Sequence, residues 1–225
     1  MRSLPLLALA VLVSAAAADA PPTQTPAPYR MGVNYFATLP AQPSSAPPGQ
    51  IEVMDFFWYG CPFCNHFEPY LEAWERSKPA NVVLVRVPAL LKPEWEPAAR
   101  AYYTAEALGI LAKSHAATFD EIHKNHDVMQ TEQDFERFFV KQFGVDPKQF
   151  EAAWTSRAME AKLAQARVLG ERYNLALCGV PTLVVNGKWI TGGDASLFNL
   201  QYPQIMPAVS YLVSLELAAM PASAK

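Results

Sequence analysis

The chain has little of what marks the specialised classes of protein. Only 10 of its 225 residues are glycine, only 3 are cysteine, and charged residues make up 17% of the total. Because 51% of the residues are hydrophobic, the chain is neither collagen-like nor a disordered acidic tail. A chain of this length buries roughly 70% of the surface that its unfolded form exposes. An ordinary apolar core can therefore hold it together, without a framework of disulfides.

The charge pattern and the missing motifs exclude several partners. The net charge is −3, from 18 basic and 21 acidic residues, which gives no electrostatic attraction for nucleic acid or anionic lipid. Glycine-rich phosphate motifs and repeats of fixed period are absent. Beyond residue 20, no stretch reaches the ~18 unbroken apolar residues of a membrane span. We therefore expect no nucleic-acid partner and no later membrane helix.

The first twenty residues are typical of an export signal. Arg2 supplies the positive charge, residues 4–18 are apolar, and Ala18-Asp19-Ala20 resembles a cleavage site. Cleavage after Ala18 stays open, because cleavage after Ala20 places a proline next to the cut. The chain is therefore expected to be exported to a compartment that permits disulfides, the periplasm.

The hydrophobic pattern predicts an α/β protein with a helical block between its strands. Residues 21–50 contain eight prolines, so they are expected to run extended, with Val33–Phe36 as a possible edge strand. Residues 94–176 carry almost only helical signals. The remaining expected elements are strands at 51–58, 82–87, 182–185 and 188–191, a helix from Pro62, a hairpin turn at Asn186-Gly187 and a last helix at 204–217.

Two of the three cysteines form the motif Cys61-Pro62-Phe63-Cys64. A pair spaced this closely cannot join distant parts of the chain, which points to chemistry. The expected strand ends just before Cys61, and Pro62 suits the first turn of a helix. The helix dipole and the first amides favour a thiolate at Cys61, so its pKa is expected below the ~8.5 of a free cysteine. Cys64, one turn further on, is expected to be more buried and to act as the resolving thiol.

Together these motifs resemble the DsbA-type thiol:disulfide oxidoreductases. The resemblance rests on residues 57–64, on Gly179-Val180-Pro181-Thr182 and on the Asn186-Gly187 turn, and it covers residues 29–215. It implies a thioredoxin fold, with a central mixed β-sheet and an inserted all-helical domain. It also implies an enzyme that donates the Cys61–Cys64 disulfide to newly exported, cysteine-containing proteins.

The resemblance also implies how the protein works in its compartment. No bound cofactor is needed, because the two sulfurs carry the electrons. An inner-membrane, quinone-linked partner of the DsbB type is expected to reoxidise the pair, and we expect a monomer. The expected division of the chain is a signal peptide (1–20), a proline-rich segment (21–50), the first thioredoxin half (51–92), the helical domain (93–176) and the second thioredoxin half (177–225).

Val180-Pro181 matches the cis-proline loop of the family, which faces the active cysteine. If the bond is cis, the backbone at Val180 can pair with an extended client peptide as an added strand. Such pairing gives affinity with little sequence preference, which suits a catalyst of many unfolded clients.

Pro62 and Phe63 stand where the family most often has Pro-His. A histidine can stabilise the neighbouring thiolate, whereas Phe63 cannot, so we expect Cys61 to be less acidic and the pair less oxidising than in a Pro-His member. Alternatively, Phe63 only adds apolar contact surface for clients. Together with Trp58 and Tyr59 it could serve both the partner and the clients, although core packing explains at least some of these aromatic residues.

Two carboxylates are candidates for tuning the site. Glu68 lies four residues after Cys64, on the same side of the helix, and Asp55 lies on the preceding strand. The resemblance implies that an acidic residue at each position lies beneath the active site and influences proton transfer to the buried cysteine. Arg86 could neutralise either one. The alternative is an exposed aspartate at a strand end and a solvated glutamate.

Cys178 is expected to be a buried apolar residue, although an accessible thiol that interferes with the active pair stays possible. A zinc site from the three cysteines and a histidine satisfies only a ligand count, so no metal is expected. We expect the histidines to lie at the surface or as satisfied core residues, and they are His66, His115, His123 and His126.

Two other functions stay open. One is a reductase or isomerase held in the dithiol form, which the Phe63 departure permits. The other is a chaperone-like module that binds clients through the helical block, with incidental cysteines. Substitution of Cys61 by serine separates them, because only an oxidase or reductase then loses all turnover.

Overall fold

A computed structural model describes residues 28–193 and 195–220 of the chain. The signal peptide expected at residues 1–20 lies outside these residues. None of the helices in the described ranges is both long and apolar enough to cross a membrane.

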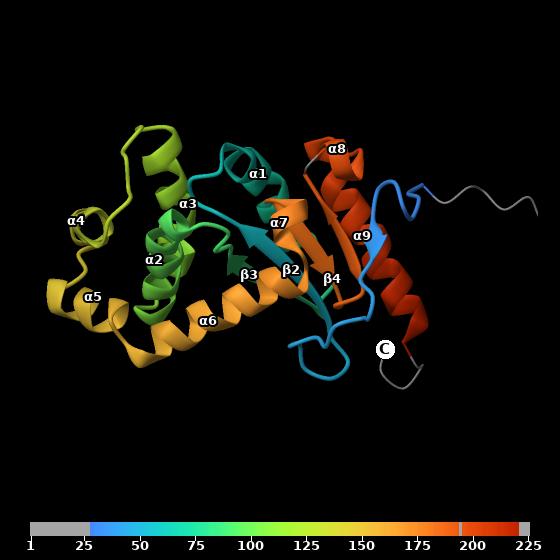
Figure 1. Cartoon of the computed structure of the whole chain (residues 1–225), viewed down its shortest axis with the longest axis horizontal. Coiled ribbons are helices and arrows are strands. Elements are labelled where there is room, and N and C mark those ends of the chain that lie inside the picture. The colour runs from blue at the N-terminus through green and yellow to red at the C-terminus, as the bar shows by residue number, and fades with distance from the viewer. Residues whose placement is uncertain (1–27, 194, 221–225) are drawn as a thin grey trace, which may run out of the picture.

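A five-stranded mixed sheet forms the centre of the molecule (Figure 1). Its strand order is β1-β5-β4-β2-β3, with β2 and β3 parallel and the other neighbours antiparallel. The strands are β1 (Phe36–Ala37), β2 (Ile51–Phe57), β3 (Val82–Pro88), β4 (Thr182–Val185) and β5 (Trp189–Gly192). All seven residues of β2 are buried, as a central strand covered on both faces requires.

Helices surround the sheet and also form a block of their own. The helical insertion, which we define as α2–α6, lies beside the β3 edge of the sheet (Figure 1). Helix α9 packs against β4 and β5, away from the insertion. The helices are α1 (Pro62–Ser77), η1 (Pro93–Trp95), α2 (Glu96–Ala107), α3 (Leu111–His123), α4 (Glu132–Phe143), α5 (Pro147–Trp154), α6 (Arg157–Arg172), α7 (Leu175–Cys178), α8 (Ala195–Phe198) and α9 (Tyr202–Ala219). The expected fold class, a mixed sheet with an inserted helical block, is confirmed.

Local signals in the sequence explain several of these boundaries. The Thr131 side chain accepts a hydrogen bond from the Asp134 amide, and Asp134 bonds back to the Thr131 amide, which forms a capping box at the start of α4. Asp146 caps α5, whose first residue is Pro147. At the β4–β5 turn, Asn186 and Gly187 have φ angles of 51° and 66°, which suits a two-residue hairpin.

The edge strand differs from the expectation. It was expected at Val33–Phe36 but forms at Phe36–Ala37, where it pairs with β5. The preceding residues form a turn instead, in which the Gly32 amide donates to the Tyr35 carbonyl and Gly32 has a φ of 79°. Glycine adopts this left-handed conformation readily. The residues before Phe36 therefore form a turn, and only Phe36 of the expected strand is in a strand.

The helical insertion has an aromatic core of its own. The Phe150 and Trp154 rings are stacked with their centroids 5.3 Å apart, and Phe139 meets Phe150 edge to face at 5.8 Å. Phe135 packs against Trp154 from α4. The insertion is thus held by packing that does not involve the sheet, and it presents α3 to the end of β2 that leads to the cysteines.

Candidate active site

The tight turn after β2 places Cys61 at the start of α1. The Cys61 amide donates a hydrogen bond to the Trp58 carbonyl at 2.9 Å, which closes the turn. Cys61 is then the N-cap of α1, and Pro62 follows as the first helical residue, where a missing N–H costs nothing. Gly60 is required within the turn, because a Cβ there would lie 2.3 Å from an indole carbon of Trp58.

Cys61 and Cys64 are not joined by a disulfide in this structure, and their two thiols differ in pKa. The pKa of Cys61 is lowered to about 7, first by the hydrogen bond from the Cys64 side chain and further by the amides of Cys64 and Phe63, although burial opposes the shift. Its sulfur lies 3.5 Å from the Cys64 nitrogen. Burial raises the pKa of Cys64 well above its ordinary value, because only 2% of this residue is exposed. At neutral pH the site therefore holds one thiolate-forming sulfur and one protonated sulfur.

The loop before β4 lies directly against Cys61. The Val180-Pro181 peptide bond is cis, as the resemblance implied. The Cys61 Sγ lies 3.5 Å from the Val180 carbonyl oxygen. Because Thr182 pairs with Phe56 in the antiparallel β2–β4 ladder, the loop sits beside the end of β2 that leads to the cysteines. This placement brings together two motifs that are 119 residues apart in the sequence.

Asp55 lies within β2 and is only 1% exposed. Burial raises its pKa to about 8, the charge of Glu68 adds to the shift, and Arg86 opposes it. Among the described residues, Asp55 Oδ1 has no hydrogen-bond partner. The Asp55 charge in turn contributes to the raised pKa of Cys64. The alternative of an exposed aspartate at a strand end is therefore wrong, because the residue lies inside the strand and beneath the site.

Glu68 is also buried, with 6% exposure, but it is paired. Its carboxylate accepts a hydrogen bond from Arg86 at 2.9 Å and lies 3.4 Å from the His115 ring nitrogen Nε2. Burial works to raise its pKa, yet His115 and Arg86 together lower it. Arg86 also binds Glu75 at 2.9 Å. Of the two candidate carboxylates, Arg86 thus forms its ion pair with Glu68, and the alternative of a solvated glutamate is wrong.

The sequence did not indicate two histidine contacts next to the site. His115 Nδ1 lies 2.8 Å from the Tyr59 hydroxyl, and His123 Nε2 lies 2.8 Å from the Tyr59 carbonyl oxygen. Both histidines are on α3, four residues either side of Phe119, so the spacing on one helix face was the available signal. Only the three-dimensional packing of α3 against the turn shows what they contact.

The aromatic residues around Cys61 divide into surface and core. Phe63 is 58% exposed beside the cysteines, and the half-buried Trp58 stacks on Trp95 with centroids 4.3 Å apart. Tyr59 is only 2% exposed, so core packing, the alternative for these aromatic residues, accounts for it. Its ring packs edge to face against Phe119, at 5.0 Å.

The third cysteine lies away from this chemistry. Cys178 is 7% exposed, which confirms the expected burial, and its sulfur faces the Tyr173 carbonyl at 3.9 Å. His66 and His126 are exposed, while His115 is a core residue. Within residues 28–193 and 195–220, no group of three or more histidine, cysteine or acidic side chains is arranged to hold a metal ion.

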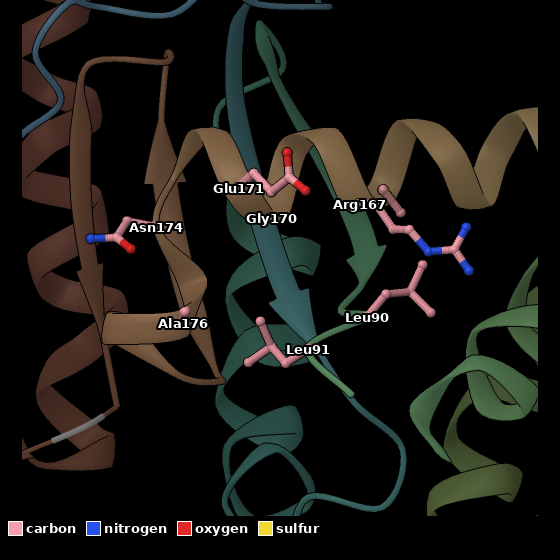
Figure 2. Close-up of a pocket in the computed structure, with 8 residues that line it drawn as sticks. Leu90, Leu91, Arg167, Gly170, Glu171, Asn174 and Ala176 are labelled. Carbon is pink, nitrogen blue, oxygen red and sulfur yellow. The ribbon is translucent and has the colours of Figure 1, made fainter. Parts of the chain in front are cut away.

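A pocket of about 430 Å³ opens between the loop after β3 and the α6–α7 junction (Figure 2). Leu90 and Leu91 lie on one side of it, and Arg167, Gly170 and Glu171 of α6 lie on another. None of the residues that the sequence suggested for the site lines this pocket. The two cysteines and Val180-Pro181 lie instead at the junction of β2, α1 and the cis-proline loop.

Comparisons with known proteins agree with this arrangement. Residues 52–202 match the family described as a DSBA-like thioredoxin domain. The chain is 39% identical over 168 residues to the thiol:disulfide interchange protein DsbA of Burkholderia cepacia, which covers 75% of this chain and 78% of that protein. It is 37% identical over 161 residues to the DsbA of Pseudomonas aeruginosa, covering 72% and 74%.

Solved structures are similar over a larger part of the chain. The crystal structure of Pseudomonas aeruginosa DsbA superposes with a TM-score of 0.77 at 34% identity, covering 85% of this chain and 96% of that one. The oxidoreductase DsbA from Xylella fastidiosa gives a TM-score of 0.74 at 32% identity, covering 83% and 96%. The likeness therefore spans the sheet and the helical insertion together.

Proposed function

This chain belongs to the DsbA-like thioredoxin family of thiol:disulfide oxidoreductases, and we propose that it acts as an oxidant, giving the Cys61–Cys64 disulfide to newly exported proteins. The observation that carries the proposal is the position of the Cys61 sulfur, which lies 3.5 Å from both the Cys64 amide nitrogen and the Val180 carbonyl oxygen. One contact stabilises a thiolate, and the other places it against a loop that can hold a peptide.

The proposed exchange has two steps. A client thiolate attacks the Cys61 sulfur of the oxidised pair, the Cys61–Cys64 bond breaks, and Cys64 leaves with the electron pair and takes up a proton. The second client thiolate then attacks the client sulfur of the mixed disulfide and releases Cys61 as a thiolate. The client loses two electrons and gains a disulfide, while the protein ends in the dithiol form. No bound cofactor is required.

The acidities of the two cysteines favour this direction. Cys61, with its pKa lowered to about 7, is the better leaving group in the second step. Cys64, with its pKa raised by burial, keeps its proton and stays out of contact with solvent. We assign Asp55 the exchange of a proton with Cys64, because it is the carboxyl group whose charge acts on that thiol and its pKa of about 8 lets it hold a proton near neutral pH.

We propose that clients bind as extended segments along Val180-Pro181, next to Cys61. The exposed Phe63 adds apolar contact surface beside the reacting sulfur. Main-chain pairing and a flat aromatic contact select weakly among sequences. Unfolded, cysteine-containing proteins are therefore the proposed clients.

Phe63 also sets how oxidising the pair is. A histidine in this position could stabilise the Cys61 thiolate by charge or by a hydrogen bond, and phenylalanine can do neither. Pro62 contributes only the fixed start of the helix. We propose that the reduced form is less strongly favoured than in a family member with Pro-His between its cysteines.

We also propose the compartment, the reoxidising partner and the domain organisation of the protein, from the sequence and from the family to which it belongs. Export through the signal at residues 1–20 would place the mature chain in the periplasm, where a quinone-linked inner-membrane partner of the DsbB type would reoxidise the pair. We propose a monomer, divided into a proline-rich segment (21–50), two thioredoxin halves (51–92 and 177–225) and the helical domain (93–176).

The proposal is tested by trapping the mixed disulfide. The oxidised protein is mixed with a reduced, unfolded client, and disulfide formation in the client is followed by mass spectrometry. The Cys64→Ala variant is activated at Cys61 as a mixed disulfide with a small thiol and is expected to accumulate a covalent complex with the client at Cys61. The Cys61→Ser variant is expected to lose all turnover. A Cys61→Ser variant that retains oxidation would refute the proposal, and one that only suppresses client aggregation as well as the unsubstituted protein does would indicate a chaperone-like module.

A further inference from the structure

Tyr59, two residues before Cys61, is held at both ends by one helix of the insertion. Its hydroxyl lies 2.8 Å from His115 Nδ1, and its carbonyl oxygen lies 2.8 Å from His123 Nε2. Both histidines belong to α3, and neither takes part in the exchange proposed above. The contacts therefore join the helical insertion to the turn that carries the reactive sulfur.

One of these hydrogen bonds has a direction fixed by its acceptor. A carbonyl oxygen only accepts, so His123 Nε2 carries a hydrogen and donates it to Tyr59. His115 Nε2 lies 3.4 Å from the Glu68 carboxylate without the geometry of a hydrogen bond, and this proximity favours a hydrogen on that nitrogen. In the tautomer with that hydrogen, His115 Nδ1 accepts from the Tyr59 hydroxyl. The result is a buried chain of groups from Tyr59 through His115 and Glu68 to Arg86.

Residues of α3 contact both segments that carry the cysteines. Tyr59 is an interior residue of the turn that the Cys61 amide closes onto Trp58. Glu68 lies on α1, four residues beyond Cys64. Helix α3 thus contacts both segments, the turn through Tyr59 and the helix through Glu68.

The position matters because the contacts of the Cys61 sulfur are long. The sulfur lies 3.5 Å from the Cys64 nitrogen, within the range of a weak hydrogen bond to sulfur. A small displacement of the turn therefore weakens the interaction that stabilises the thiolate. The apolar neighbours Phe57 and Phe119 hold the Tyr59 ring less specifically than polar contacts do, and the polar contacts of its hydroxyl, to His115 and Thr118, both come from α3.

We propose that His115 and His123 are positioning residues for disulfide exchange, which hold Tyr59 so that the Cys61 sulfur stays over the first amides of α1. The proposal deepens the proposed function and rests on Cys61 being the exchanging sulfur. It gives the helical insertion a part in the chemistry that is separate from any contact with clients.

Conservative substitutions separate the two contacts of the His115 ring, with Tyr59 through Nδ1 and with Glu68 through Nε2. His115→Asn keeps an acceptor near the position of Nδ1 and so keeps the Tyr59 contact, whereas His115→Gln keeps a donor near Nε2 and so keeps only the Glu68 contact. Tyr59→Phe removes one oxygen atom and leaves the ring packing intact, so this variant is expected to fold. The double variant Tyr59→Phe/His115→Gln is expected to equal Tyr59→Phe, because Tyr59→Phe already removes the hydroxyl that His115 contacts.

The carbonyl contact is tested in the same way. His123→Gln retains an N–H donor of similar reach, and His123→Leu removes it. His126 provides the matched control, because it is exposed, follows α3, and has a left-handed φ of 57° that asparagine tolerates. His126→Asn is expected to behave as the unsubstituted protein.

The readout is the pKa of Cys61 in the full chain, measured from thiolate absorbance and from the pH dependence of mixed-disulfide formation. We expect a rise of about one pKa unit, a tenfold change in the acid dissociation constant, in Tyr59→Phe, His115→Gln and His123→Leu. We expect no change in His115→Asn, His123→Gln or His126→Asn.

Four results would overturn the proposal, part of it, or its basis. An unchanged Cys61 pKa in all variants, with only a lower melting temperature, would leave the histidines as core residues. A change confined to His123→Leu would overturn the part assigned to His115, and a change confined to the Tyr59 and His115 variants would overturn the part assigned to His123. Thiolate absorbance and exchange that survive Cys61→Ser would instead refute the proposed function.

Discussion

The sulfur of Cys61 lies 3.5 Å from the carbonyl oxygen of Val180, although the two residues are 119 positions apart in the chain. The contact exists because β4 starts just after Pro181 and pairs with the end of β2 that delivers Cys61. A client peptide that pairs with the loop at Val180 is thereby brought to the reacting sulfur. In the proposed function, sheet register rather than a deep pocket brings the bound client to the reacting sulfur.

The residue between Pro62 and Cys64 is the first target for substitution. Phe63→His is expected to lower the pKa of Cys61 by about one unit or more, because a cationic or hydrogen-bonding ring then lies beside the thiolate. The reduction potential of the Cys61–Cys64 pair should rise as the Cys61 pKa falls, because a more stable thiolate favours the reduced form. Thiolate absorbance against pH measures the first effect, and Phe63→Leu controls for the loss of the aromatic surface. A pKa that Phe63→His leaves unchanged would contradict the account of this position.

Asp55 is expected to make stability depend on pH. Its pKa is raised to about 8 in the folded protein, whereas an unfolded aspartate titrates near 3.9. Between these values the folded state binds more protons, so stability falls as pH rises from about 4 to about 8, by up to roughly 1.4 kcal/mol per pH unit. Asp55→Asn removes this dependence and should stabilise the protein most at pH 8 and little at pH 4.

Urea unfolding at both pH values measures the effect of Asp55→Asn. The matched control is Glu151→Gln, which changes a carboxyl group on the exposed face of α5. Equal stabilisation by Asp55→Asn at pH 4 and pH 8 would mean that its pKa is not raised in the folded state.

Glu216 has the opposite pH dependence. Its carboxylate accepts hydrogen bonds from Asn186, Lys188 and Trp189, at 2.6, 2.7 and 2.8 Å, which fasten the β4–β5 hairpin to α9. Burial works against the charged form, but these donors lower the pKa of Glu216. Its contribution to stability is therefore present above the pKa of an unfolded glutamate and is lost as pH falls through the lower, folded value.

Glu216→Gln should accordingly destabilise the protein at pH 7 by about 1.5–3 kcal/mol, the range of a hydrogen bond to a charged group. Thermal unfolding at pH 7 and at pH 3 measures the difference, which should shrink at the lower pH. A loss of the same size at both pH values would show that the charge of Glu216 contributes nothing.

The cysteines should also differ in reactivity. In the reduced, folded protein, alkylation by iodoacetamide is expected to modify Cys61 with a midpoint near pH 7, following its thiolate fraction. Cys61 and Cys178 are about equally buried, at 6% and 7% exposure, so the difference expected between them rests on the stabilised thiolate of Cys61 and not on access. Cys64, whose pKa is raised, should react only after denaturation. Peptide mapping by mass spectrometry locates the label. Modification of Cys178 at the rate of Cys61 at pH 7 would contradict the part assigned to the Cys61 thiolate.

Much of this site could be predicted from the sequence, because local patterns specify it. Three patterns each carry their own physical signal: a buried strand that ends at Phe57, shortly before Cys61, a proline at the start of a helix, and Asn186-Gly187 between two short strands. The same holds for the capping box at Thr131. Local chemistry and the final fold agree at these points.

What the sequence could not give depends on tertiary packing. Asp55 is buried because β2 has a neighbouring strand on each side. Arg86 pairs with Glu68 because of how β3 lies relative to α1. The contacts of His115 and His123 require the insertion to fold back onto the turn. A histidine on an amphipathic helix looks the same in sequence whether it faces solvent or an active-site turn.

The equilibrium reduction potential of the Cys61–Cys64 pair, measured in a glutathione buffer, tests the central claim most directly. If the protein is an oxidant of exported clients, the potential should lie near or above about −150 mV, more oxidising than the roughly −180 mV of protein disulfide isomerase. A potential near the roughly −270 mV of thioredoxin would mean that the pair is held reduced. The protein would then be a reductase or isomerase, and the proposed direction of exchange would be wrong.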